Sequence, residues 1–355
     1  MTTMKTFSTS NTDMAAVAVQ IKNSLPAKPT LLLYFHSATF DAAAVAATLA
    51  KTYPGIPSIG CSTAGEIVTG HMLDGSLVVA AFTSELVPKV EVVGIVGNDV
   101  KAALATLTAK FDKVDLATHV GIILMDGLSG KEEQIMESLG DCTDLTFVGG
   151  SAGDDLKFAK TFVAANGKIV SGSGALALLE VPAGFDLIKT QSFCATGKTL
   201  TPTRVDQATR AVLEFNGKPA AQAYAEAVGA KSAEDAAHAF MDAPLGLMAG
   251  SEPYVRSPQR IDKDKLYFYC GVKEGVELAV LKGTDIVADT KKALTGSKHR
   301  GLVVFNCILR TLELKDQGKT EAFGKLFTQP VVGFSTYGEA YIGHMNQTAT
   351  ILALR

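Results

Sequence analysis

The chain has 355 residues, of which 47% are hydrophobic and 19% are charged, and its formal net charge is −3. This length allows one large domain or two ordinary ones, and the apolar content is enough for a substantial core. The slightly negative charge and the lack of basic runs argue against nucleic acid or an anionic membrane as a partner.

No stretch approaches the ~20 apolar residues of a membrane-spanning helix, and the first residues lack the apolar core of a signal peptide. The 5 cysteines are widely scattered and form no Cys-x-x-Cys pair. This pattern argues against a disulfide framework or a thiolate zinc site. We therefore expect a cytoplasmic protein.

In chain order, the predicted elements fall into three similar units. Each unit has a short apolar strand, a helix, a second short strand that leads into a loop, and a third strand. The units cover Leu31 to Phe82, Gly121 to Leu179, and Gly301 to Leu354. In each, the first strand and the loop are roughly 30 residues apart, which is the size of a strand–helix–strand unit. We predict a repeated strand–helix–loop–strand architecture.

Further predicted strands lie between the units, and hairpin signals such as Asn166-Gly167 imply mixed sheets. The sequence becomes polar between Lys198 and Arg210, where we place a domain boundary. The expected fold is α/β (α+β mixed) with two domains, residues 1–200 and 201–355.

A seven-residue phrase recurs at the loops. It reads Gly-Cys-Ser-Thr-Ala-Gly-Glu at Gly60–Glu66 and Gly-Phe-Ser-Thr-Tyr-Gly-Glu at Gly333–Glu339. A copy one residue shorter, Gly-Gly-Ser-Ala-Gly-Asp, occupies Gly149–Asp154. Three such loops would gather hydroxyls and carboxylates at strand ends, where ligands bind in α/β sheets.

Together with Asn306-Cys307-Ile308-Leu309-Arg310, these phrases resemble the FIST family of bacterial sensory modules, which have an N-terminal and a C-terminal FIST domain. The resemblance extends from about Leu31 to Leu354. It implies a FIST N-like domain over residues 1–200 and a FIST C-like domain over residues 201–355.

The resemblance implies a non-enzymatic, intracellular sensor for signal transduction that binds a small molecule and regulates a partner. Some stand-alone FIST proteins of similar length resemble a haem-binding nitric-oxide sensor that regulates a histidine kinase, a form of two-component regulation. This chain carries no kinase, GGDEF, PAS or receptor segment, which places it nearer the stand-alone group. The oligomeric state is left open.

An alternative function is serine hydrolysis. Gly149–Gly153 matches the G-x-S-x-G nucleophile elbow, with Ser151 as the nucleophile. That motif requires a helix after the turn, whereas Leu156 to Val163 has strand character, and the sister loops break the spacing. The competing interpretation is a tight turn repeated with the unit.

The loop side chains are the candidate ligand groups. A carboxylate at each loop end suits an amine or guanidinium ligand, or else caps its own loop through backbone N–H groups. An arginine beside an apolar strand would hold a carboxylate, such as a haem propionate, or would pair with a loop acid. The predicted set is Cys61, Ser62, Thr63, Glu66, Ser151, Asp154, Arg256, Asn306, Arg310, Ser335, Tyr337 and Glu339.

If the chain binds haem, a single histidine can hold the iron. Our candidates are His344, then His71, then His36. His71 and His344 each follow a loop acid by five residues. The histidines lack the spacing of a zinc site, and the competing interpretation for each is a hydrogen-bonded loop or core residue. Cys61 is likewise either a haem or redox group or a small buried side chain.

Overall fold

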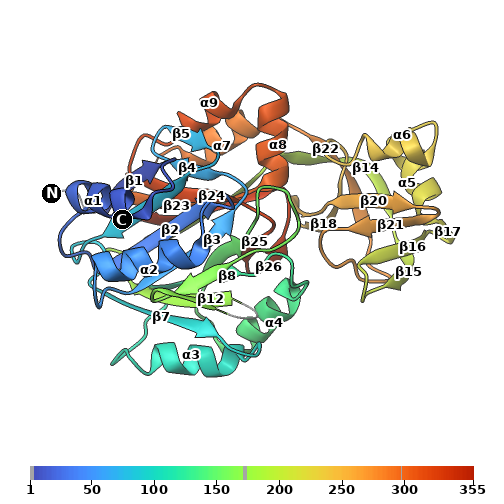
Figure 1. Ribbon diagram of the computed structural model, residues 1–355. Coiled ribbons are helices and arrows are strands. Elements are labelled where there is room, and N and C mark those ends of the chain that lie inside the picture. Colours follow the sequence, from blue (N-terminus) through green and yellow to red (C-terminus); the bar gives the residue numbers. More distant parts are fainter. Residues whose placement is uncertain (1–3, 171–173, 297) are drawn as a thin grey trace. The chain divides into compact units, whose positions relative to one another are not determined.

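The computed structural model describes residues 4–170, 174–296 and 298–355 (Figure 1). The chain forms two compact units. The first contains residues 1–190, 290–344 and 349–355, and the second contains residues 191–289 and 345–348. The polar stretch at 198–210, predicted from sequence as a boundary, lies largely in two strands of the second unit, β14 (Phe193–Leu200) and β15 (Pro202–Asp206).

The first compact unit contains three six-stranded sheets built on one plan. The first sheet runs β1 (Met4–Thr9), β6 (Leu77–Phe82), β2 (Leu31–Ser37), β3 (Ser58–Thr63), β10 (Val163–Ala165) and β11 (Lys168–Val170). The second runs β7 (Lys89–Ile95), β12 (Gly174–Glu180), β8 (His119–Met125), β9 (Phe147–Ser151), β25 (Glu339–Tyr341) and β26 (Gly343–Met345). The third runs β13 (Phe185–Gln191), β27 (Thr348–Leu354), β23 (Gly301–Cys307), β24 (Val331–Thr336), β4 (Glu66–Val68) and β5 (His71–Leu73).

Strand directions confirm that the predicted repeat is real. The pairs β2/β3, β8/β9 and β23/β24 are parallel. The third strand of each repeat, β6, β12 or β27, lies antiparallel to the first strand. The expected mixed α/β fold with mixed sheets is therefore confirmed.

The hairpin that follows each phrase pairs with another repeat. β4–β5 joins β24 of the third repeat, β10–β11 joins β3 of the first, and β25–β26 joins β9 of the second. Each repeat thus adds its hairpin to the sheet of another repeat, so the three repeats are linked in a cycle.

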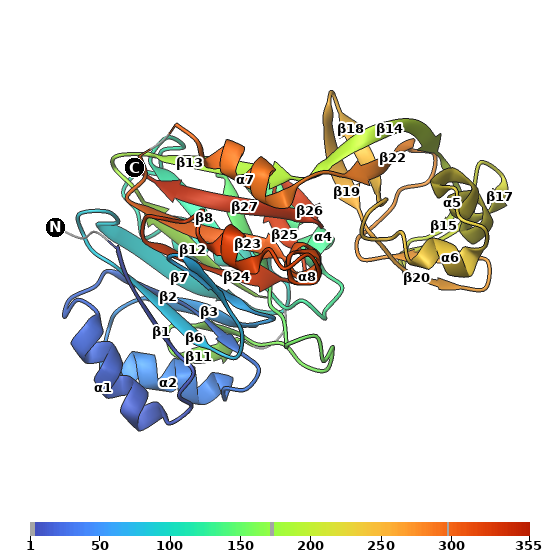
Figure 2. The same cartoon turned by 90° about the horizontal axis from the view of Figure 1, so that it is seen from above.

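A helix connects the parallel strands in each repeat. These helices are α2 (Ala42–Thr52), α4 (Glu132–Cys142), and α8 (Ile308–Asp316) with α9 (Thr320–Gly324). The flanking helices are α1 (Met14–Ser24), α3 (Val100–Thr108) and α7 (Ile286–Leu294). Figure 2 shows α1 and α2 side by side on one face of the first sheet, where their buried apolar residues share a core with β2 and β6.

One large core lies between the three sheets and draws apolar residues from all of them. Phe35 and Phe334 have ring centroids 4.4 Å apart, and Phe305 and Phe334 have centroids 5.8 Å apart. All three rings are fully buried. Because this core draws residues from all three repeats, each repeat depends on the others to bury its apolar face.

The first glycine of each phrase allows two parallel strands to approach closely. A Cβ atom at these positions would meet the carbonyl oxygen of the paired residue on the first strand. The distances would be 2.4 Å from Gly60 to Tyr34, 1.7 Å from Gly149 to Ile123 and 2.2 Å from Gly333 to Val304. The glycine therefore recurs because any side chain would push the strands apart.

The second compact unit contains two smaller sheets and two helices. One sheet runs β14, β22 (Leu278–Gly283), β18 (Leu245–Ala249) and β19 (Glu252–Arg256). The other runs β15, β16 (Ala211–Phe215), β21 (Lys265–Phe268) and β20 (Pro258–Asp262), with β17 (Lys218–Pro219) beside β16. The helices are α5 (Ala220–Val228) and α6 (Ala233–Ala237).

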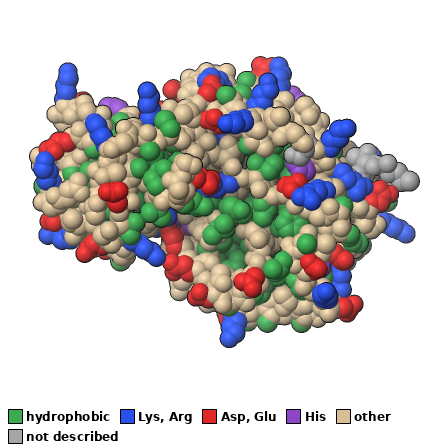
Figure 3. Space-filling model, turned by 180° about the vertical axis from the view of Figure 1, so that it is seen from behind, with side chains coloured by type: hydrophobic (Ala, Val, Ile, Leu, Met, Phe, Trp, Pro, Cys, Tyr) green, Lys and Arg blue, Asp and Glu red, His purple; other side chains and the backbone are tan. Residues whose placement is uncertain are grey.

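Among the described residues, no helix is both long and apolar enough to cross a bilayer. Acidic and basic side chains are interspersed on the face drawn in Figure 3. This mixture agrees with the small net charge of −3.

Candidate functional site

The three phrase loops meet and hydrogen-bond to one another in a cycle. In each case, the amide two positions after the phrase serine donates to the carbonyl of a serine in another repeat. The bonds run from Ala64 to Ser335 (3.4 Å), from Gly153 to Ser62 (2.9 Å) and from Tyr337 to Ser151 (3.1 Å). The structure therefore brings the predicted loop residues together.

The two glutamates of the loops are buried inside this ring. Thr63 Oγ1 donates to Glu66 Oε1, and Thr336 Oγ1 donates to Glu339 Oε1 in the equivalent position. Glu66 Oε2 also accepts from the amide (3.0 Å) and the hydroxyl (2.5 Å) of Ser76. Burial raises the pKa of Glu66 to about 7, although these hydrogen bonds act in the opposite direction. Glu66 thus fixes its own loop and the turn before β6.

Asp154 caps the loop that follows it. Its carboxylate accepts hydrogen bonds from the amides of Phe158, Ala159 and Lys160, at 2.6 to 2.9 Å. The Tyr337 hydroxyl donates to Asp154 Oδ1 at 2.5 Å. Burial acts to raise the pKa of Asp154, but these hydrogen bonds outweigh it and hold the pKa below its usual value.

The loop after Asp154 contains strained backbone. Asp155, Leu156 and Phe158 have φ values of +55°, +63° and +50°. Non-glycine residues seldom adopt this left-handed region, and such strain concentrates at functional sites. The Tyr337 hydroxyl also accepts from the Leu156 amide at 2.9 Å, and its ring stacks on Phe158 at 5.0 Å. Tyr337 therefore holds the strained loop.

The phrase serines are buried and differ in their partners. Ser62 Oγ accepts from the Phe162 amide (2.9 Å), and Ser335 Oγ bonds Thr311 Oγ1 (2.8 Å). Ser151 has 0% exposure, and among the described residues its hydroxyl has no hydrogen-bond partner.

The hydrolase alternative is unsupported. After Ser151, the next regular element is a strand, β10, and not the helix that a nucleophile elbow requires. The strand expected from Leu156 begins only at Val163, because the preceding residues form the loop capped by Asp154.

A second buried network extends from β23 into α8. Arg310 is 1% exposed, and its guanidinium donates to Asn306 Oδ1 (3.0 Å) and Thr290 Oγ1 (2.9 Å). Asn306 Nδ2 donates to Thr311, which bonds Ser335 of the third phrase. This network ties the Asn306–Arg310 segment to the loop ring.

Arg256 belongs to the second compact unit. Its Nη1 atom donates to the carbonyl of Val255 at 3.1 Å. Cys61 lies in the core of the first unit, where burial raises the pKa of its thiol well above the ordinary value, with a smaller contribution from Glu66. This environment suits an unreactive side chain.

The three candidate histidines have different environments. His344 is buried, with Nδ1 3.5 Å from Glu133 and Nε2 so close to Gly338 that a Cβ there would lie 2.1 Å away. His36 is buried and pairs through Nδ1 with the Ser37 carbonyl (3.0 Å); burial lowers its pKa. His71 is exposed on the β4–β5 hairpin. The packing around His344 leaves no space for a metal-bound macrocycle at Nε2, so this residue does not fit a haem.

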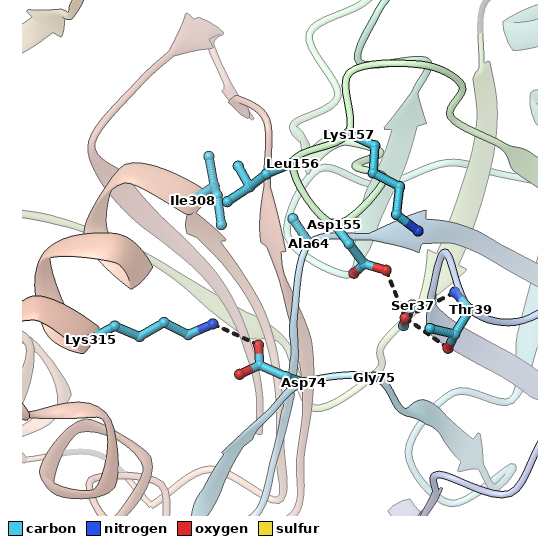
Figure 4. Close-up of a pocket in the computed structure, with 10 residues that line it drawn as sticks. All are labelled: Ser37, Thr39, Ala64, Asp74, Gly75, Asp155, Leu156, Lys157, Ile308 and Lys315. Carbon is cyan, nitrogen blue, oxygen red and sulfur yellow. Dashed lines mark hydrogen bonds and ion pairs between the residues drawn. The ribbon is translucent and has the colours of Figure 1, made fainter.

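A cavity of about 370 Å³ lies beside the loop ring in the first unit. Figure 4 shows its lining, which comes from the ends of β2 and β3, the turn before β6, the strained loop and α8. The lining residues are Ser37, Thr39, Ala64, Asp74, Gly75, Asp155, Leu156, Lys157, Ile308 and Lys315. Its position at the carboxyl ends of strands is where α/β sheets bind ligands.

Charges of both signs line this cavity. Asp155 Oδ2 accepts from the Ser37 hydroxyl (2.8 Å) and the Ala38 amide (2.9 Å), which fixes the carboxylate at the end of β2. Lys315 Nζ pairs with Asp74 Oδ1 at 2.8 Å. Figure 4 shows the two carboxylates between Lys315 and Lys157.

A second cavity of about 280 Å³ shares Asp74 and Lys315 with the first. It is also lined by Thr311, which belongs to the buried Asn306–Arg310 network. The Asp74–Lys315 ion pair therefore lies between the two cavities, and the second cavity borders this network.

Sequence reasoning missed the charged groups of the cavity, which are Asp74, Asp155, Lys157 and Lys315. Two signals point to them in retrospect. Asp155 directly follows Asp154, the loop acid of the second repeat, and Lys315 lies on the helix that begins within the Asn306–Arg310 segment.

Comparison with protein families identifies the chain. The FIST N domain family model matches residues 30–218, and the FIST C domain model matches residues 220–341. The chain belongs to the FIST family. FIST domains are associated with sensory signal transduction and small-ligand binding, a role that suggests a sensor without catalytic activity.

The chain is similar to Uncharacterized protein MJ1623 of Methanocaldococcus jannaschii, with 27% identity over 259 residues. The alignment covers 66% of this chain and 49% of that protein. The chain therefore spans about half the length of the curated relative that it matches.

Proposed function

We propose that this FIST protein is a sensor that binds a small ligand carrying both an ammonium group and a carboxylate, such as an amino acid, in the 370 Å³ cavity. Asp155 would receive the ammonium group, and Lys315 would receive the carboxylate. Opposite charges in one small cavity suit such a ligand, because charge-assisted hydrogen bonds are stronger than neutral ones.

The observation that carries the proposal is the fixed carboxylate of Asp155 on strained backbone. Asp155 Oδ2 is held by two donors, while the residue has a φ of +55°. Strain of this kind costs about 1–3 kcal/mol per residue and persists where the surroundings enforce it. A group held so firmly at a cavity is preorganised for binding.

The same loop connects the ligand cavity to the protein surface. Asp155, Leu156 and Lys157 line the cavity, while Phe158 is exposed and stacks on Tyr337. A ligand that binds one arrangement of this loop more tightly shifts the population of that arrangement. The loop would then present a different surface to a partner signalling protein.

The test is isothermal titration calorimetry of the full chain against a panel of amino acids, their decarboxylated amines and their deaminated acids. The proposal predicts that only compounds with both groups bind tightly, and that Lys315→Met weakens binding. Lys325→Met is the matched control, because Lys325 is an exposed lysine that pairs with Glu321 away from the cavity lining. Equal affinity in both variants, or no binding across the panel, would overturn the proposal.

Haem-based sensing of nitric oxide upstream of a histidine kinase is a more specific function, which rests on the family resemblance alone. The packing of His344 against Gly338 does not support it. Haem titration of the parent protein beside His71→Ala tests it. A parent that develops no Soret band would remove this form of the proposal.

A further inference from the structure

The second cavity beside Lys315 is not used by the two ligand groups placed in the first cavity. Its volume is about 280 Å³, and it shares Asp74 and Lys315 with the 370 Å³ cavity. Both cavities belong to the first compact unit. A ligand whose carboxylate binds Lys315 therefore lies at the junction of the two cavities, and its side chain can extend from there into the second one.

The lining of the second cavity combines an aliphatic wall, two hydroxyls and a carboxylate. Met72 and Leu73 of β5 supply the wall, and Thr320 is the first residue of α9. Thr311 is the buried member of the lining, at 1% exposure, and its hydroxyl accepts from Asn306 Nδ2 at 2.9 Å. Such a lining suits a chain of methylene groups that ends in a hydrogen-bond donor.

Asp74 supplies the carboxylate of this lining. A Cβ atom at Gly65 would lie 3.3 Å from Asp74 Oδ1 and 3.2 Å from Ser335 Oγ, so the carboxylate lies against the first phrase loop. The ion pair of Asp74 with Lys315 has side chains that are 65% and 42% exposed. Because an ion pair this exposed contributes little to stability, a ligand can replace it at low cost.

The charges of the two cavities favour a ligand with an additional positive charge. When a ligand carboxylate binds Lys315, Asp74 loses its cation, and Asp155 is already assigned to the ammonium group. Figure 4 shows the Lys157 ammonium group on the Ser37 side of the cavity, away from Asp74 and Lys315. A basic side chain in the second cavity would restore the partner that Asp74 loses.

We infer that the ligand of this sensor is a basic amino acid, such as lysine or arginine. Its α-ammonium group binds Asp155, and its carboxylate takes Lys315 from Asp74. Its side chain enters the second cavity, where the released Asp74 carboxylate receives the side-chain cation. This inference rests on the proposed function, because it names the ligand class of the same site.

The test is isothermal titration calorimetry of the full chain with L-arginine and L-citrulline, which have nearly the same shape and differ in side-chain charge. Arginine should bind about tenfold more tightly, and lysine should exceed norleucine in the same way. Asp74→Asn should remove both preferences and leave citrulline and norleucine binding unchanged or tighter, because Lys315 is released. The matched control is Asp112→Asn, an exposed aspartate outside both cavity linings.

The second cavity is tested separately by Thr320→Tyr, which fills it from α9. Binding of arginine and lysine should fall about tenfold, whereas glycine and alanine should keep their affinities because their side chains do not reach this cavity. Thr328→Tyr is the control, at an exposed threonine outside both linings. Should Thr320→Tyr fail to fold, the Asp74→Asn comparison decides alone.

Two results would overturn the inference and leave the proposed function standing. One is equal affinity for arginine and citrulline that Lys315→Met weakens for both. The other is a preference for arginine that Asp74→Asn leaves intact. If no compound with both an ammonium group and a carboxylate binds, the inference and the proposed function fail together.

Discussion

Replacing Glu66 with glutamine should stabilise the protein at neutral and alkaline pH and leave its stability nearly unchanged near pH 5. Glu66 has 0% exposure, and among the described residues its hydrogen-bond partners, Thr63 and Ser76, are neutral. The groups that act on its pKa, Ser76, Thr63 and Asp155, include no cation. Its charge is therefore uncompensated, whereas a glutamine can keep the same partners without one.

The size of the effect follows from the pKa. Burial raises the pKa of Glu66 from 4.5 to about 7. At roughly 1.4 kcal/mol per pKa unit, this rise corresponds to about 3 kcal/mol. The folded protein binds this proton more tightly than the unfolded chain. The contribution to stability is therefore complete below pH 4.5 and is lost as the pH rises through about 7.

The assay is urea denaturation of the parent and Glu66→Gln between pH 5 and pH 8. The transition is followed by circular dichroism, because the chain has no tryptophan, and by hydrogen exchange of the 66–76 segment. The control is Glu321→Gln, an exposed residue whose pKa is lowered by Lys325, so its variant should not gain stability as the pH rises. A stability difference between Glu66→Gln and the parent that does not grow with pH would refute the reasoning.

Three other changes test the fold and the candidate site. Tyr337→Phe removes the hydroxyl that bonds Asp154 and the Leu156 amide. It should destabilise the protein by about 1–3 kcal/mol and speed hydrogen exchange in residues 154–160. Unchanged exchange would show that the loop conformation does not depend on the Tyr337 hydroxyl. Gly149→Ala should destabilise by about 3 kcal/mol or more, because its Cβ would lie 1.7 Å from a backbone oxygen, whereas Gly140→Ala on α4 has open space and should be neutral or stabilising in the same denaturation assay. In a haem titration, His344→Ala should match the parent, and a loss of the Soret band in this variant alone would contradict the packing argument.

The repeated phrase was enough to predict the repeat, because each copy keeps the glycine that the parallel strands require. The exchange of hairpins could not be predicted in the same way. β4 and its partner β24 are separated by more than 260 residues, and the short strand β4 carries no signal for its distant partner. The boundary between residues 200 and 201 stays a prediction.

The candidate site was predicted in part. The loop hydroxyls and acids do converge, but Glu66 and Asp154 bond groups of their own loops and the adjoining turn. The cavity groups instead come from positions between the phrases, and Asp155 and Lys315 are 160 residues apart in sequence. Their proximity results from the packing of the repeats around one core, which no local pattern encodes.

The location of the ligand is the most direct test of the proposed sensor, and hydrogen exchange with mass spectrometry measures it. The full chain is compared with and without the compound that binds most tightly in the amino-acid panel. A ligand in the 370 Å³ cavity should slow exchange in residues 37–39, 74–76 and 154–158, which surround the cavity, with the strongest effect next to Asp155. Protection confined to other segments, with these three unchanged, would contradict it.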